Sequence, residues 1–158
     1  MKRLLLIFIP LLLLAASCGN NCYVPQRAQA GVAFMDSTGL QPKDLYRVTV
    51  KGMGNDSLLY DAVASLSVIY LPLKNSETST QFEVTCQLSS DEGAMLQNYL
   101  LTIQHTNYPQ LISPECGCVM FHTITDAQFV GQEGASMVEI YNPQVVNIEQ
   151  DVHIKVSL

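Results

Sequence analysis

Three segments of the chain alternate apolar and polar residues with a period of two, and this pattern constrains the fold more than any other feature. Residues 46–51 and 81–88 alternate without interruption, and the pattern returns within residues 148–158. A period of two places successive side chains on opposite faces of an extended strand, whereas a helix repeats every 3.6 residues. The alternation therefore predicts β-strands with one face buried and the other exposed.

The register of the second segment can be predicted residue by residue. Phe82, Val84 and Cys86 share one face of the expected strand, and Glu83 and Thr85 share the other. A slip of one residue would turn every apolar side chain toward water, so the register is strongly specified. We predict that the three apolar side chains face the core.

Turn signals separate further candidate strands. These are residues 31–35, 65–71, 98–105, 117–125 and 137–141. No segment keeps helical spacing of apolar residues over three turns, and residues 94–100 allow one or two turns at most. We predict an all-β fold, a single antiparallel β-sandwich of immunoglobulin-like type with about seven or eight strands; the alternative is a small closed β-barrel.

The N-terminus has the organisation of a secretory signal peptide. Lys2 and Arg3 precede an apolar run over residues 4–14, and small residues at 15–17 precede Cys18. This ending resembles the lipobox of bacterial lipoproteins, which implies cleavage before Cys18 and lipidation of that cysteine. We expect a signal peptide at 1–17, a lipidated N-terminus and tether at 18–29, and a β domain at 30–158.

The charge of the chain argues against one class of partner. The sequence contains 8 basic and 14 acidic residues, and loss of Lys2 and Arg3 with the signal peptide would leave 6 basic residues and a net charge of −8. Proteins that bind nucleic acids concentrate Lys and Arg on one face. We therefore expect no nucleic-acid partner.

Four cysteines follow Cys18, and an oxidising compartment favours disulfides between them. They are Cys22, Cys86, Cys116 and Cys118. Two residues along a strand, Cα atoms lie about 6.6 Å apart and the Cβ atoms point the same way, so a Cys116–Cys118 bridge is disfavoured. Two connectivities remain open: Cys22–Cys116 with Cys86–Cys118, or Cys22–Cys118 with Cys86–Cys116.

A metal site is the competing interpretation of the same segment. Cys116, Cys118, Met120 and His122 share one face of the expected strand, and sulfur with imidazole suits Cu(I). The paired spacings typical of zinc sites are missing, however, and the neighbouring residues are apolar. We expect structural cysteines, no metal and no cofactor.

The sequence contains none of the common catalytic motifs. A nucleophile elbow, an HExxH pair, a P-loop and a GxGxxG turn are all missing. His105, His122 and His153 belong to no such motif, and we expect each to be a surface residue or a hydrogen-bonded structural residue. The sequence predicts no catalytic residues and a protein that is not an enzyme.

Several short stretches occur in a defined order after the signal peptide. They are Cys22, Ser65-Leu66-Ser67 leading to Leu71-Pro72-Leu73, Thr78-Ser79-Thr80-Gln81-Phe82, Ile112-Ser113-Pro114-Glu115-Cys116-Gly117, and Asn147-Ile148-Glu149 with His153-Ile154-Lys155-Val156. Together they resemble a family of small Bacteroidetes lipoproteins whose shared domain has no assigned function. The resemblance implies an envelope location, a β-rich fold and a recurrent Cys22–Cys116 pair, which leaves Cys86 and Cys118 for a second bridge. No acidic cluster follows Cys18, which in such lipoproteins implies anchoring in the outer membrane with the domain facing the periplasm.

These features predict a non-enzymatic envelope lipoprotein, held on the membrane by its lipid, that binds another envelope protein, a peptide or a glycan. The alternative is a carrier of a small apolar ligand in a β-barrel. A carrier would need a cavity of several hundred Å³ lined by residues such as Tyr46, Leu101 and Phe121.

Overall fold

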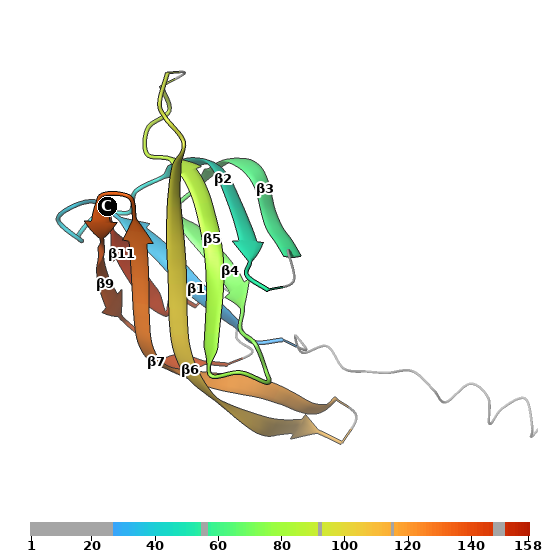
Figure 1. Cartoon of the computed structure of the whole chain (residues 1–158). Coiled ribbons are helices and arrows are strands. Elements are labelled where there is room, and N and C mark those ends of the chain that lie inside the picture. Colours follow the sequence, from blue (N-terminus) through green and yellow to red (C-terminus); the bar gives the residue numbers. More distant parts are fainter. Residues whose placement is uncertain (1–26, 55–56, 92, 115, 147–150) are drawn as a thin grey trace, which may run out of the picture.

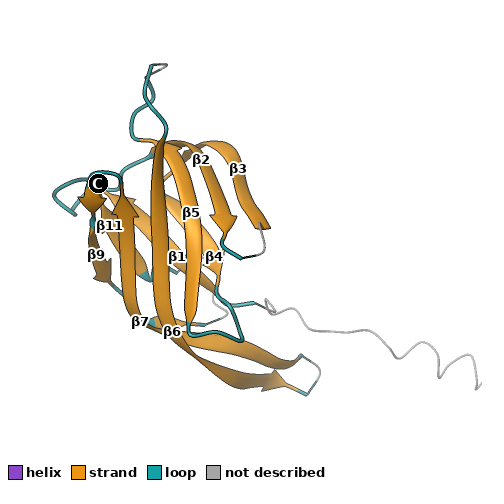
Figure 2. Cartoon of the chain, viewed as in Figure 1, coloured by secondary structure: helices purple, strands orange, loops and turns teal. Residues whose placement is uncertain are grey.

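The structure, a computed structural model, describes residues 27–54, 57–91, 93–114, 116–146 and 151–158. These residues form eleven strands and no helix (Figures 1 and 2). The strands are β1 (Gln29–Met35), β2 (Leu45–Gly52), β3 (Ser57–Leu66), β4 (Val68–Pro72), β5 (Ser79–Gln87), β6 (Gln97–Ser113), β7 (Gly117–Gly131), β8 (Gly134–Ala135), β9 (Met137–Ile140), β10 (Gln144–Val145) and β11 (Ile154–Ser157). Within the described ranges, no helix is long and apolar enough to span a bilayer.

The strands form two sheets. The smaller sheet has the order β4-β1-β11-β9, and the larger has the order β10-β7-β6-β5-β2-β3 with β8 paired to β7. The sheets are not closed into a barrel. The predicted sandwich is therefore confirmed, and the barrel alternative is wrong.

Among the described residues the sandwich has eleven strands where about seven or eight are predicted, and two further details differ in the structure. The first and last strands, β1 and β11, pair in parallel, with Val32 opposite Ile154. The predicted strand at 65–71 is two strands, because the chain leaves the larger sheet at the end of β3 and enters the smaller sheet as β4. Ser67 lies at this crossing, where its carbonyl oxygen accepts a hydrogen bond from the Phe34 N–H at 2.8 Å. Alternation does not show a change of sheet, because the period stays two on both sides.

The predicted register of β5 is confirmed. The side chains of Phe82, Val84 and Cys86 are buried, Glu83 is exposed and Thr85 is half-buried. Burial of alternate side chains against the opposite sheet accounts for this register.

Aromatic rings fill the space between the sheets. Phe34 on β1 meets Phe129 on β7 edge to face, with ring centroids 5.9 Å apart. Tyr99 on β6 stacks on Phe129 with centroids 4.6 Å apart. Gly131 lies opposite Tyr99 in the β6–β7 ladder, and a Cβ at Gly131 would lie 2.6 Å from the Tyr99 ring. The tyrosine thus occupies the space that the missing glycine side chain leaves.

The sandwich has two distinct ends (Figure 1). We call the end where β1 begins, at Gln29, the N-terminal end. The parallel partner strand β11 finishes beside the end of β1, where Ser157 lies opposite Met35. We call this the C-terminal end. From the N-terminal end, the first part of β7 and the last part of β6 extend as a long hairpin (Figure 1).

Candidate functional site

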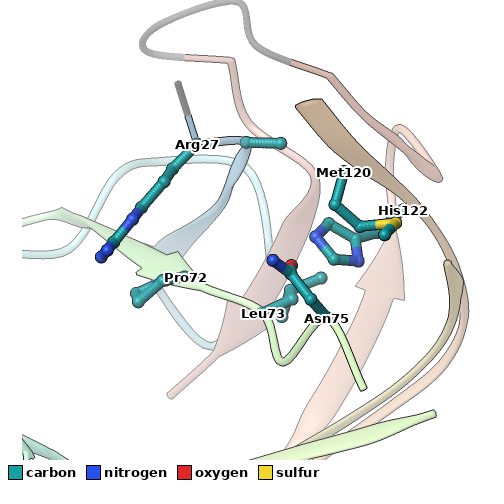
Figure 3. Close-up of a pocket in the computed structure, with 7 residues that line it drawn as sticks. Arg27, Pro72, Leu73, Asn75, Met120 and His122 are labelled. Atoms are coloured by element: carbon teal, nitrogen blue, oxygen red, sulfur yellow. The ribbon is translucent and has the colours of Figure 1, made fainter. Parts of the chain in front are cut away.

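A pocket of about 200 Å³ opens at the N-terminal end, and we name it the His122 pocket. It is lined by Arg27, Ala28, Pro72, Leu73, Asn75, Met120 and His122 (Figure 3). These residues come from the segment before β1, from the end of β4 and the loop that follows it, and from β7. Figure 3 shows the Arg27 side chain extending away from His122. Besides Arg27, the described lining residues with polar side chains are Asn75 and His122.

Asn107 of β6 holds two buried histidines in place. Its Nδ2 donates to three backbone oxygens, those of Lys74 at 3.2 Å, Asn75 at 3.0 Å and Glu77 at 2.7 Å. Carbonyl oxygens only accept, so this arrangement fixes which end of the amide is the donor. Asn107 Oδ1 must then accept, and it lies 2.7 Å from Nδ1 of both His105 and His122. Both rings therefore carry their proton on Nδ1.

His105 continues this network toward β5. Because its proton lies on Nδ1, His105 Nε2 accepts the hydroxyl proton of Thr80 at 2.8 Å. The Thr80 oxygen in turn accepts the Lys74 N–H at 3.0 Å. Both ring nitrogens of His105 and the hydroxyl group of Thr80 therefore have hydrogen-bond partners.

His122 differs, because its Nε2 has no hydrogen-bond partner among the described residues. Its Nδ1–H is committed to Asn107, so Nε2 carries a lone pair and no proton. The residue is only 1% exposed. Among the described side chains, no polar atom that is fully shielded from solvent lacks a partner. The Nε2 atom therefore reaches the accessible space that the pocket provides.

The imidazoles of the network are kept neutral by their surroundings. Desolvation first, and the neighbouring His105 second, lower the pKa of His122 to about 4. Desolvation also lowers the pKa of His105, against the opposing effects of the Asn107 hydrogen bond and of Glu77. At neutral pH, His122 therefore presents a hydrogen-bond acceptor to the pocket and no charge.

His153 is the third buried histidine, and its ring links β1 to the backbone of β10. Its Nδ1 accepts the Gly31 N–H at 2.9 Å, and its Nε2–H donates to the Gln144 oxygen at 3.1 Å. Burial lowers its pKa, against the opposing effect of Asp151. All three histidines are hydrogen-bonded structural residues, one of the two outcomes expected from the sequence.

The protein should lose stability as the pH falls from 7.5 to 5. The pKa of His122 in the folded protein is about 4, below the value of about 6.5 in an unfolded chain. Below about pH 6.5 the unfolded state therefore binds more protons than the folded state, and the free energy of unfolding decreases. We expect a loss of about 1 to 2 kcal/mol at pH 5, measured by urea unfolding. A free energy of unfolding that stays constant over this range would contradict the prediction.

A second, larger pocket of about 450 Å³ lies at the C-terminal end, and we name it the C-terminal groove. It is lined by Leu88, Met95, Leu96, Gln97, Asn98, Tyr99, Gly131, Gln132, Glu133, Gly134, Ala135, Ser136, Ser157 and Leu158. Met95 is 83% exposed and Leu96 is 50% exposed. The hydroxyl of Tyr99 donates to Gln97 Oε1. Of the lining residues that the structure describes, Glu133 is the one whose side chain carries a charge at neutral pH.

The predicted Cys86–Cys118 bridge is wrong. Both residues carry free thiols, that of Cys86 buried and that of Cys118 exposed. Cys86 pairs with Gln97 at one end of β6, and Cys118 pairs with Leu111 near the other. Fourteen residues of strand span about 45 Å, far beyond the 4.4–6.8 Å Cα separation of a disulfide.

The free thiols of Cys86 and Cys118 also exclude both the disfavoured Cys116–Cys118 bridge and the crossed connectivity. Cys116 is disulfide-bonded. Cys18 and Cys22 lie outside the described residues, so lipidation and the Cys22–Cys116 pairing stay predictions.

The residues of the competing metal interpretation are only partly brought together. Met120 and His122 line the same pocket, but Cys116 and Cys118 do not line it. No group of three or more Cys, His, Asp or Glu side chains in the described ranges could hold a metal ion. Neither pocket is lined by Tyr46, Leu101 or Phe121, the residues expected around a carried ligand.

Sequence reasoning missed Asn107, Thr80 and Asn75. One signal was present: His105 and Asn107 continue the alternating apolar positions of β6, so polar side chains occur in a buried register. Such residues need internal hydrogen-bond partners. The partners come from a loop about 30 residues away in the sequence, as the sequence separations of the Asn107 bonds show.

Neither the curated proteins nor the solved structures include a match to this chain. A family model does match, over residues 47–158, which is more than two thirds of the chain. The chain therefore belongs to the family of unknown function DUF6452.

Proposed function

We propose that the protein is a non-enzymatic lipoprotein, anchored in the outer membrane through Cys18 and facing the periplasm, that binds another envelope protein. The basic start, short apolar run and small residues before Cys18 support the anchor. The order of short motifs supports the more specific relation to small Bacteroidetes lipoproteins. A Cys22–Cys116 bridge would leave little flexible chain between lipid and sandwich.

The observation that carries this proposal is the C-terminal groove. It combines a volume of about 450 Å³ with the highly exposed apolar side chains of Met95 and Leu96. Soluble monomers seldom expose contiguous apolar surface, and where they do it often marks an interaction site. Because Glu133 is the one charged side chain among the described residues that line the groove, the groove suits a partner segment that carries apolar and basic side chains.

The position of the groove fits an anchored protein. The described chain begins at Arg27, at the N-terminal end of the sandwich, and the groove lies at the opposite end. A lipid on Cys18 would therefore hold the N-terminal end closest to the membrane. The C-terminal groove would then face away from the membrane, toward proteins of the periplasm.

The test uses the lipidated full-length protein in its own cells. A photo-crosslinking residue at Met95 should capture a partner that the same residue at Leu111, an exposed position on the hairpin, does not capture. The purified partner should then bind Met95→Ser/Leu96→Ser at least about tenfold more weakly than wild type, a loss of about 1.4 kcal/mol. Leu111→Ser is the matched control and should bind normally. Equal affinity of wild type and the groove variant would refute the proposal.

A carrier of one small apolar ligand is the second candidate. The sheets do not close into the barrel that a carrier was expected to use. The volume of the C-terminal groove, about 450 Å³, nevertheless lies within the range of about 300–1,000 Å³ typical of ligand pockets. Native mass spectrometry of protein extracted from its own membranes separates the two functions. A bound small molecule that is lost in Met95→Ser/Leu96→Ser would favour the carrier.

A further inference from the structure

The His122 pocket contains a hydrogen-bond acceptor that the described residues leave unused. The imidazole is only 1% exposed, and the 2.7 Å bond from Nδ1 to Asn107 fixes its orientation. Its Nε2 faces the pocket with a free lone pair. Because Nε2 can be reached from the pocket while the ring that carries it is fixed and otherwise buried, the pocket points to a ligand with an N–H or O–H donor.

The other lining residues define what surrounds that donor. The Asn75 amide lines the same pocket and can both donate and accept. The other described lining residues, Ala28, Pro72, Leu73 and Met120, contribute apolar side chains. Arg27, the one charged side chain among the described lining residues, extends away from His122 (Figure 3). The complementary group is therefore neutral, carries a donor beside an acceptor, and ends in a small apolar part.

The size of the pocket limits the ligand further. Its volume of about 200 Å³ is below the range of about 300–1,000 Å³ for drug-sized ligands. It equals the volume of roughly seven water molecules at about 30 Å³ each. The pocket can thus admit one terminal group and no long segment.

We propose that the His122 pocket binds the N-acetyl group of an acetylated amino sugar in a glycan. The acetamido N–H donates to His122 Nε2, the acetamido oxygen accepts from Asn75 Nδ2, and the methyl group packs against Pro72 and Leu73. An acetyl group is a chain end and can enter a pocket whose histidine is almost fully buried. An extended peptide would need space for the chain on both sides.

This inference goes beyond the partner protein proposed for the C-terminal groove, because it concerns a different site. From His122 to Gly131, which lines the groove, β7 runs nine residues, or about 30 Å. The two sites can therefore be tested separately. A variant of one should leave the other unchanged.

The first test follows the histidine rings by NMR in the full-length protein labelled on histidine. N-acetylglucosamine at millimolar concentrations should shift the ring signals of His122. Glucosamine and glucose, which lack the acetyl group, should not shift them. The ring of His153 is an internal control, because both of its nitrogens are already hydrogen-bonded. No shift with N-acetylglucosamine would overturn the proposal, and an equal shift with glucose would overturn it as well.

N-acetylglycine separates a sugar from a peptide end, since both carry the same amide. Equal binding of N-acetylglycine and N-acetylglucosamine would overturn the assignment to a sugar.

The second test uses variants that leave the buried network intact. Asn75→Ala removes an exposed side chain, and the backbone oxygen of residue 75 can still accept the hydrogen bond from Asn107. This variant should bind N-acetylglucosamine at least tenfold more weakly than wild type. Asn98→Ala, at an exposed position on β6, is the matched control and should bind normally. Met95→Ser/Leu96→Ser should also bind the sugar normally. Unchanged binding in Asn75→Ala would overturn the proposal.

Discussion

Replacing Gly31 with alanine should destabilise the protein by about 3 kcal/mol or more. A Cβ at Gly31 would lie 2.1 Å from the backbone oxygen of Asp151 and 3.1 Å from the ring of Tyr70. The first of these atoms belongs to backbone and cannot turn aside as a side chain would. The shift would also strain two hydrogen bonds to His153, one from the Gly31 N–H at 2.9 Å and one to the Gly31 oxygen at 2.8 Å.

Urea unfolding measures this loss, and Gly93→Ala is the control. A Cβ at Gly93 would meet nothing within 4 Å, so that variant should stay within about 0.5 kcal/mol of wild type. Since small domains have a total stability of about 5 to 15 kcal/mol, Gly31→Ala should lower the denaturation midpoint clearly. If the free energy of unfolding of Gly31→Ala lies within about 1 kcal/mol of the wild-type value, the close approach of β1 to Asp151 is not maintained in solution.

Replacing Asn107 with alanine should cost about 3 to 5 kcal/mol. The change removes the acceptor shared by Nδ1–H of His105 and of His122, and it removes the donor to three carbonyl oxygens. Each buried polar group left without a partner costs about 1 to 3 kcal/mol. For a chain of this size we expect the melting temperature to fall by about 10 °C.

Asn98→Ala is the control for this change, because Asn98 lies on the same strand, is exposed, and accepts one hydrogen bond from Thr85. It should cost less than about 1 kcal/mol. NMR of the histidine rings gives a second measurement, since loss of Asn107 should change the ring signals of His105 and His122 and leave those of His153 unchanged. Equal melting temperatures for the Asn107 and Asn98 variants would contradict the proposed network.

The alternation of apolar and polar residues predicts correctly those strands that have one face against the core and the other toward water. Phe82, Val84 and Cys86 were placed correctly, because β5 lies inside a sheet with one face against the core and the other toward water. The edge strand β3 was not predicted. Its burial pattern has no regular alternation, and its pairing with β2 contains two register shifts. Bulges of this kind disturb the period of two on which prediction depends.

For the disulfide bridges, local spacing predicts correctly only between residues that are close in the sequence. Spacing alone correctly disfavoured a Cys116–Cys118 bridge, because strand geometry over two residues is local. The prediction of a Cys86–Cys118 bridge is wrong, because the distance between these residues depends on where their pairing partners, Gln97 and Leu111, lie along β6. No property of either residue indicates that distance.

The sequence by itself determined that this chain is all-β, with a particular buried face on its regular strands, because alternation follows from backbone geometry and burial residue by residue. The tertiary structure alone decided the sites. Asn107 reaches His122 through strand pairing and Asn75 through a loop far away in the sequence, and the groove joins residues 88–98, 131–136 and 157–158. Which strands become neighbours depends on the burial of the whole core and on chain closure over long distances. A pattern that repeats every two residues carries no information about that choice.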